Sequence, residues 1–193
     1  MALKIAIIYG SVRSERQGIK AALFIMDQLE KRGHQAVLID PAQYDLPLID
    51  KLYNDYAAGE APTALQEIAG ILLEADAFII VSGEYNHTIP PALTNLIDHF
   101  NQEYRWRPAG IASYSNGPFG GVRAVGHLRD HLSHVGMATI PTSFPISKVQ
   151  EAFDEQGNAI DTAYERRIQR FLNELEWYAN ALKEARKAGV PYA

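Results

Sequence analysis

The chain alternates short, nearly continuous apolar runs with longer segments whose apolar residues recur at helical spacing. In the run at 77–82, residues 77–81 are all apolar, as expected of a strand that is covered on both faces of a sheet. Repeated alternation of strand and helix is typical of a parallel, doubly wound sheet. We therefore predict an α/β fold with a five-stranded parallel sheet and helices on both faces. The predicted strands are 3–9, 35–40, 77–82, 108–114 and 137–144, and the predicted helices are 17–32, 63–75, 90–101, 121–136 and 161–187.

Length and composition limit what the whole chain can be. Its 193 residues fit one domain, 1–193, which is large enough to bury a good core. A formal net charge of −5 argues against a nucleic-acid-binding surface, and no apolar run approaches the roughly 18 residues of a membrane span. The absence of cysteine excludes disulfides, thiolate metal ligands and a cysteine nucleophile. We expect a cytoplasmic protein with neither nucleic acid nor membrane as partner.

The longest predicted loop, 41–62, is unusual for a compact domain and indicates a role in the site or in assembly. It holds more apolar and aromatic residues than a free loop should expose, which predicts a homodimer or homotetramer. These residues are Tyr44, Leu46, Leu48, Ile49, Tyr53 and Tyr56. A second, polar excursion at 150–158 precedes the last helix and has the pattern of a hairpin.

The loop after the first predicted strand, residues 10–18, reads GSVRSERQG. At the carboxyl end of a parallel strand, its N–H groups and the start of the next helix favour an anion. Ser11 adds a hydroxyl donor, and Arg13 and Arg16 add guanidinium groups suited to phosphate. The loop has neither the ending of a Walker A loop nor the G-x-G-x-x-G spacing of dinucleotide-binding turns. Asp40 follows about 30 residues after the loop begins, whereas a ribose-binding acid is expected after about 20.

The loop after the third predicted strand, residues 83–91, carries a Tyr-Asn pair that can stack on and hydrogen-bond a flat ring. With the strand order 2-1-3-4-5, this loop and the 10–18 loop meet at the switch point of the sheet, where ligands bind. A phosphate site beside a ring site describes a mononucleotide, and the ring site points to a flavin. A third, glycine-rich loop follows the fourth strand at 113–121.

Together, the three loops resemble the NADPH-dependent FMN reductase family, a flavodoxin-like group that includes quinone reductases and azoreductases. The resemblance covers about residues 3–183. Its elements match in chain order at 10–18, 84–86, 90–98 and 113–124. Gly83 stands where the family usually has proline, and His87 where it has a small residue. These departures leave the choice of electron acceptor open.

The resemblance implies an enzyme with bound FMN, with NADPH or NADH as electron donor. The acceptor it implies is a small molecule: a quinone, an azo compound, free flavin or a metal oxyanion. Because the cofactor supplies the chemistry, no catalytic side chain is assigned. The family usually forms homodimers, sometimes paired into tetramers. NADPH against NADH, and dimer against tetramer, stay open.

The resemblance also implies roles for particular residues. Those expected around the phosphate are Ser11, Arg13, Gln17 and Gly18. Arg16 joins them as a candidate because of its charge, with a solvated loop charge as the alternative. Those expected to border the isoalloxazine and ribityl chain are Glu84, Tyr85 and Asn86. Those expected on the other side of the ring are Ser115, Gly117 and Gly120.

Other kinds of site fit the sequence less well. His127, His131 and His134 share one face of helix 121–136, but no HExxH motif accompanies them, so we expect a solvated or subunit-contact face and no metal. No G-x-S-x-G elbow supports a hydrolase triad. Arg123 is expected to pair with an acid, with the phosphate of NADPH as the alternative. The competing functions are a one-electron carrier like flavodoxin and a flavin-sensing interaction protein.

Overall fold

A computed structural model describes residues 2–192 and shows a parallel five-stranded sheet with the order β2-β1-β3-β4-β5. Its strands are β1 (Lys4–Tyr9), β2 (Gln35–Ile39), β3 (Ala77–Gly83), β4 (Arg107–Tyr114) and β5 (Met137–Ser143). The predicted fold class and strand order are confirmed. The sheet reverses its order between β1 and β3, so the loops that follow these two strands leave the sheet side by side.

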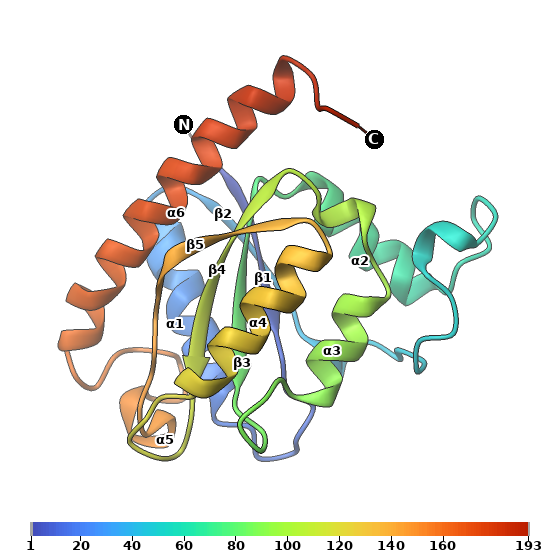
Figure 1. The fold of residues 1–193 in the computed structure, drawn as a ribbon. Helices are drawn as coiled ribbons and strands as arrows, with labels where there is room; N and C mark the ends of the chain where they lie inside the picture. Colours follow the sequence, from blue (N-terminus) through green and yellow to red (C-terminus); the bar gives the residue numbers. More distant parts are fainter. Residues whose placement is uncertain (1, 193) are drawn as a thin grey trace.

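Helices cover both faces of the sheet (Figure 1). One face carries α1 (Gly18–Lys31) and α6 (Ala163–Lys187), and the other carries α2 (Thr63–Glu74), α3 (Pro91–Asp98) and α4 (Val122–His134). Successive strand residues alternate between these two cores: Ile7 of β1 packs with α1 and α6, and Ile8 packs with α2 and α3. None of the helices within residues 2–192 is long and apolar enough to span a membrane.

The helix ends lie within two residues of their predicted positions, except at the end of α3. Helix α3 ends at Asp98, three residues before the predicted end at 101, and a 3-10 turn follows at Gln102–Tyr104. On α4, the residues that pack inward include Ala124 and Leu128, one turn apart. The apolar residues of this helix predict that Val122 is buried. Val122 lies two positions before the inward stripe, on the opposite side of the helix, and is therefore exposed.

The polar excursion before α6 contains a short helix, α5 (Val149–Ala152). An isolated antiparallel bridge between Phe153 and Ala159 then closes a hairpin-like turn. The Asp154 carboxylate stabilises this turn, because it accepts hydrogen bonds from the backbone N–H groups of Gln156 and Asn158 at 3.0 and 2.8 Å. This segment brings α5 beside the third glycine-rich loop.

Loop 41–62 projects from one side of the molecule (Figure 1) and contains two 3-10 turns, Pro41–Gln43 and Tyr53–Asp55. Most of its large side chains pack against the core formed by α2 and α3. These are Tyr44, Leu46, Tyr53 and Tyr56. Leu48 and Ile49 remain exposed, at 85% and 40%. The apolar content of the loop is thus largely used within the chain, which weakens it as an argument for an oligomer.

Candidate functional site

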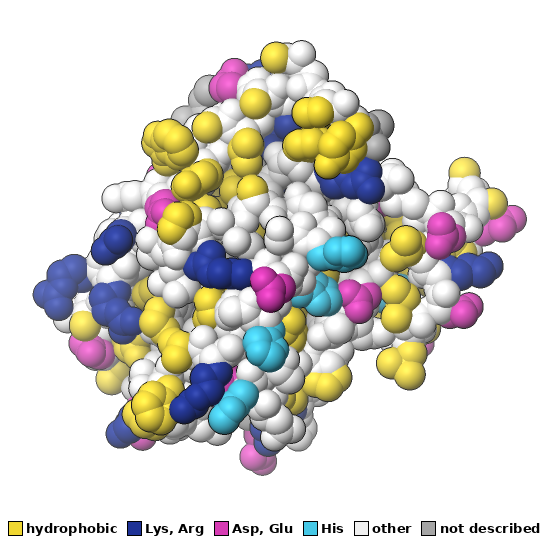
Figure 2. All heavy atoms as spheres, viewed as in Figure 1, with side chains coloured by type: hydrophobic (Ala, Val, Ile, Leu, Met, Phe, Trp, Pro, Cys, Tyr) yellow, Lys and Arg dark blue, Asp and Glu magenta, His cyan; other side chains and the backbone are white. Residues whose placement is uncertain are grey.

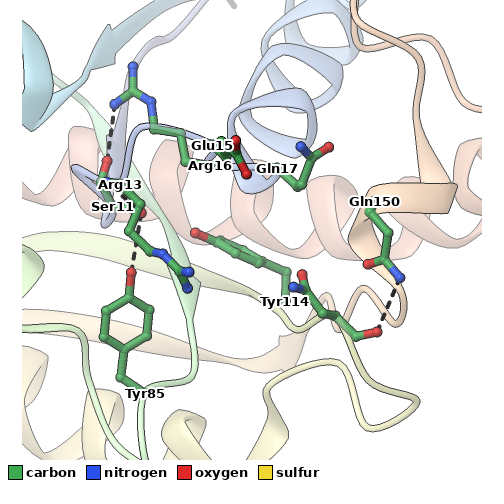
Figure 3. A pocket seen from close by; sticks show the side chains of 9 residues that line it. Ser11, Arg13, Glu15, Arg16, Gln17, Tyr85, Tyr114 and Gln150 are labelled. Atoms are coloured by element: carbon green, nitrogen blue, oxygen red, sulfur yellow. Dashed lines mark hydrogen bonds between the residues drawn. The ribbon is translucent and has the colours of Figure 1, made fainter.

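A cavity of about 260 Å³ opens where the chain leaves β1, β3 and β4. It lies at the switch point of the sheet, where the sequence predicts the ligand site. Its walls come from all three loops and from α5 (Figure 3). The lining residues are Ser11, Arg13, Glu15, Arg16, Gln17, Tyr85, Tyr114, Asn116 and Gln150. Five of them belong to the residues predicted from the sequence: Ser11, Arg13, Arg16, Gln17 and Tyr85.

Hydroxyl groups gather beside the cavity. Ser11 Oγ lies 3.4 Å from Tyr85 Oη, and Tyr114 Oη donates to Tyr9 Oη at 3.3 Å. The rings of Tyr9 and Tyr114 are buried and stacked, with centroids 6.3 Å apart. Burial raises the pKa of Tyr114 and that of Tyr9, so both hydroxyls stay protonated at neutral pH. Sequence reasoning missed Tyr114 because the residue reads as the end of an apolar strand.

The two arginines of the first loop have different surroundings. The Arg16 guanidinium forms a bidentate ion pair with Asp40, just after β2, and donates to the carbonyl oxygen of Ser11 at 3.0 Å. The Arg13 guanidinium points into the cavity (Figure 3). Within residues 2–192, no hydrogen bond or ion pair engages it. Arg13 is therefore the arginine of this loop whose hydrogen-bonding capacity remains available to a ligand.

Gly18, the first residue of α1, lies directly against Tyr114. A Cβ atom at this position would fall 2.1 Å from Tyr114 Cζ, far inside van der Waals contact, so the packing requires glycine. A Cβ atom on Gly83 would lie 3.2 Å from the same ring. The residue before the helix, Gln17, makes no side-chain capping hydrogen bond. The first N–H groups of α1 therefore remain available to an anion.

The second loop forms a tight turn from Tyr85 to Thr88, closed by two reciprocal backbone hydrogen bonds of 3.0 Å. At its tip, Asn86 and His87 adopt positive φ angles of 50° and 67°. The Glu84 carboxylate is engaged by the start of α4. It accepts the backbone N–H of Arg123 at 2.9 Å and lies 3.7 Å from the Arg123 guanidinium. Arg123 thus has the acidic partner that the sequence suggested, and neither Glu84 nor Asn86 lines the cavity.

The third loop contributes shape rather than lining at its predicted positions. Ser115 Oγ donates to the carbonyl oxygen of Gly117 at 3.1 Å, and Gly120 has a φ of 62°, which glycine adopts without strain. The loop lines the cavity through Asn116, whose carbonyl oxygen accepts from Gln150 Nε2 at 3.3 Å. Gln150 could not be found from spacing, because it lies beyond β5 and reaches the loop only in the folded chain.

The histidines of α4 make contacts within the chain. His127 Nδ1 lies 2.9 Å from Thr88 Oγ1, and His131 Nε2 lies 2.9 Å from Asp98 Oδ1. Figure 2 shows histidine side chains gathered over this part of the surface. Among the residues that the structure describes, no group of three or more His, Cys, Asp or Glu side chains is placed to hold a metal ion.

Hydrogen-bond donors suited to a phosphate lie beside a turn that carries an aromatic residue. A comparison with known families agrees with this arrangement. A family model described as NADPH-dependent FMN reductase matches residues 3–151. The chain belongs to the NADPH-dependent FMN reductase family. It is an FMN-dependent NAD(P)H oxidoreductase, as the resemblance of the three loops predicted.

Related proteins support this family assignment. An NAD(P)H-dependent FMN reductase from Pseudomonas aeruginosa is 33% identical over 162 residues, covering 77% of this chain and 86% of the relative. An NADPH:quinone oxidoreductase from Arabidopsis thaliana is 28% identical over 189 residues, covering 94% of each chain. The flavoenzyme NAD(P)H:(acceptor) oxidoreductase FerB from Paracoccus denitrificans has a TM-score of 0.72 at 22% identity, covering 95% of this chain and 98% of its own. This last likeness shows a shared fold.

Proposed function

We propose that this FMN reductase binds the phosphate of FMN between the 10–18 loop and the start of α1. The observation that carries the proposal is the unengaged Arg13 guanidinium, which points into the cavity beside the Ser11 hydroxyl. The free N–H groups at the start of α1 and the Ser11 hydroxyl add neutral donors. One unengaged cation with several neutral donors suits a phosphate group.

We assign the ring end of FMN to the second and third loops. Tyr85 lines the cavity next to the proposed phosphate end and offers an aromatic face, and Asn86 at the tip of the turn offers an amide. Ser115, Gly117 and Gly120 give the third loop its shape. In this proposal Glu84 does not contact FMN. Its carboxylate joins the second loop to α4 and so supports the position of the loop.

When bound, FMN supplies the hydride-transfer chemistry, and the chain binds and orients it. Backbone N–H groups in the glycine-rich third loop can stabilise negative charge on the ring, which requires no acidic or basic side chain. We propose a quinone as acceptor, which takes up two electrons and two protons to become a hydroquinone. The relatives from Arabidopsis thaliana and Escherichia coli named as quinone reductases support this choice. Azo compounds, free flavin and metal oxyanions are the other acceptors to assay.

Arg13→Ala tests the phosphate site. Loss of a charge-assisted hydrogen bond costs about 1.5–3 kcal/mol, so FMN affinity should fall roughly ten- to hundredfold. Riboflavin lacks the phosphate and should be affected far less. Equilibrium titrations of both ligands measure this, and Arg170→Ala, which removes an exposed arginine from α6, is the matched control. Equal weakening of both ligands by Arg13→Ala, or no weakening, would show that Arg13 does not hold the phosphate.

We also propose a homodimer or homotetramer in the cytoplasm. The oligomer is supported by exposed apolar side chains near the site, Phe119 and Val122 at 60% and 45%, together with Leu48 and Ile49 in the projecting loop. Light scattering should give a mass well above the 21.5 kDa of one chain. A mass of one chain at micromolar concentration would contradict the oligomer, and cell fractionation tests the location.

A further inference from the structure

Arg16 leaves the first loop in a different direction from Arg13 (Figure 3). Its two terminal nitrogens meet the two carboxylate oxygens of Asp40, and one of them also reaches the Ser11 carbonyl oxygen at 3.0 Å. The guanidinium carbon lies 5.3 Å from the centre of the Tyr9 ring. The side chain therefore joins three segments: the loop itself, the end of β1 and the end of β2.

Asp40 is held in place on its side of this ion pair. The residue is only 1% exposed, and its Oδ1 also accepts the backbone N–H of Ala42 at 3.1 Å. The hydrogen bond with Asp40 raises the pKa of Arg16, so the guanidinium stays charged and paired. A cation that is neutralised at close range by a buried carboxylate has little net charge left to attract a phosphate.

The third contact of Arg16 reaches the residue that organises the first loop. Ser11 is buried, its Oγ accepts the backbone N–H of Arg13 at 3.4 Å, and the same Oγ lies 3.4 Å from Tyr85 Oη. Arg16 contacts both the Ser11 carbonyl oxygen and Asp40, and so its side chain fixes the position of the loop relative to β2.

We propose that Arg16 is a positioning residue: with Asp40, it holds loop 10–18 in the shape that binds the FMN phosphate, and only Arg13 presents its charge to the ligand. This inference rests on the proposed phosphate site. It reassigns Arg16 from the candidate phosphate ligands, and it makes FMN affinity depend on Asp40, which does not line the cavity.

Titrations with FMN and riboflavin at low and high salt test the proposal on Arg16→Gln, Asp40→Asn and the double variant. Both single variants should weaken FMN by roughly tenfold or more and riboflavin far less. The double variant, which can retain an amide–amide hydrogen bond without buried charge, should bind FMN at least as well as the weaker single variant. FMN affinity in all three should keep the salt dependence of the wild type, whereas Arg13→Ala should flatten it. Asp27→Asn, which breaks the exposed pair with Lys31 on α1, is the matched control.

The opposite pattern would overturn the proposal. If Arg16 contacts the phosphate, Arg16→Gln should flatten the salt dependence, and Asp40→Asn should leave FMN binding unchanged or tighten it. Equal loss of riboflavin and FMN in both variants would make the pair a general support of the fold instead.

Hydrogen exchange without cofactor provides a separate measurement. The amides of residues 11–17 should exchange faster in Arg16→Gln and in Asp40→Asn than in wild type, and unchanged exchange would refute the positioning role. Because this measurement needs no FMN, it distinguishes the two hypotheses. A wild type that binds FMN no better than riboflavin would refute the phosphate site, whereas the exchange result would still decide whether Arg16 holds the loop.

Discussion

Gly18→Ala inserts a methyl group where the Tyr114 ring now lies. The new Cβ would be 2.1 Å from Tyr114 Cζ and 2.5 Å from its Oη, whereas carbon atoms in contact need about 3.5 Å or more. Tyr114 is 8% exposed and hydrogen-bonded to Tyr9, so displacing its ring would disturb this hydrogen bond and the packing around it. Overpacking typically costs about 1–3 kcal/mol, and alanine recovers at most about 1 kcal/mol over glycine in a helix. We expect a net loss of about 1–2 kcal/mol in the free energy of unfolding.

Urea denaturation of the cofactor-free protein measures this loss, with Gly70→Ala as the matched control. Gly70 is also helical, in α2, but its new Cβ would meet no atom within 4 Å, so this variant should gain about 0.5–1 kcal/mol. In a Tyr114→Ala background, Gly18→Ala should no longer destabilise, because the ring it displaces is gone. If Gly18→Ala stabilises the wild type as Gly70→Ala does, the close packing of Tyr114 on α1 is wrong.

Three further outcomes follow from the structure. Glu84→Ala should lower stability by about 0.5–2 kcal/mol, because it removes the oxygen that accepts the Arg123 N–H at the start of α4, and an unchanged urea midpoint would contradict this role. The free energy of unfolding should fall as pH rises above about 10. Burial raises the pKa values of Tyr9, Tyr104 and Tyr114, so the unfolded chain releases protons that the folded chain retains. Urea denaturation between about pH 8 and pH 11 tests this. Double-reciprocal plots for NAD(P)H and a quinone should be parallel, because one flavin face serves both substrates in turn, and intersecting lines would exclude a shared site.

Most of the fold could be predicted because the strands are buried on both faces. Every strand boundary lies within one residue of its predicted position, since an apolar run with turn residues at its ends has few other interpretations. Helix faces were harder to predict. On α1, helical spacing predicts that Leu23 and Met26 face the core. Phe24 and Ile25 are buried instead, and Leu23 and Met26 are only partly covered, because α1 packs against the α5 segment and α6 as well as the sheet. A simple periodic stripe cannot describe a helix with neighbours on several sides.

The candidate site could be predicted only where one local segment carries the signal. Ser11, Arg13 and Tyr85 lie in loops whose position after a strand already places them at the switch point. Tyr114 and Gln150 reach the cavity through packing between distant segments, and no spacing in the chain encodes that contact. The partner of Arg16 is a similar case. The sequence places Asp40 at the end of its strand, but only the folded chain brings the two side chains together.

Because α5 forms one wall of the cavity, the cavity is complete only after α5 has folded against the rest of the chain. Residues 11 and 150 line the same cavity, so its two ends are separated by most of the chain. During synthesis loop 10–18 emerges early, but the cavity cannot close until α5 has left the ribosome and docked against the third loop through Gln150. In the proposed site, capture of the flavin is therefore a late event for each newly made chain. A chain arrested before residue 150 would display the loop sequence without a finished site for the cofactor.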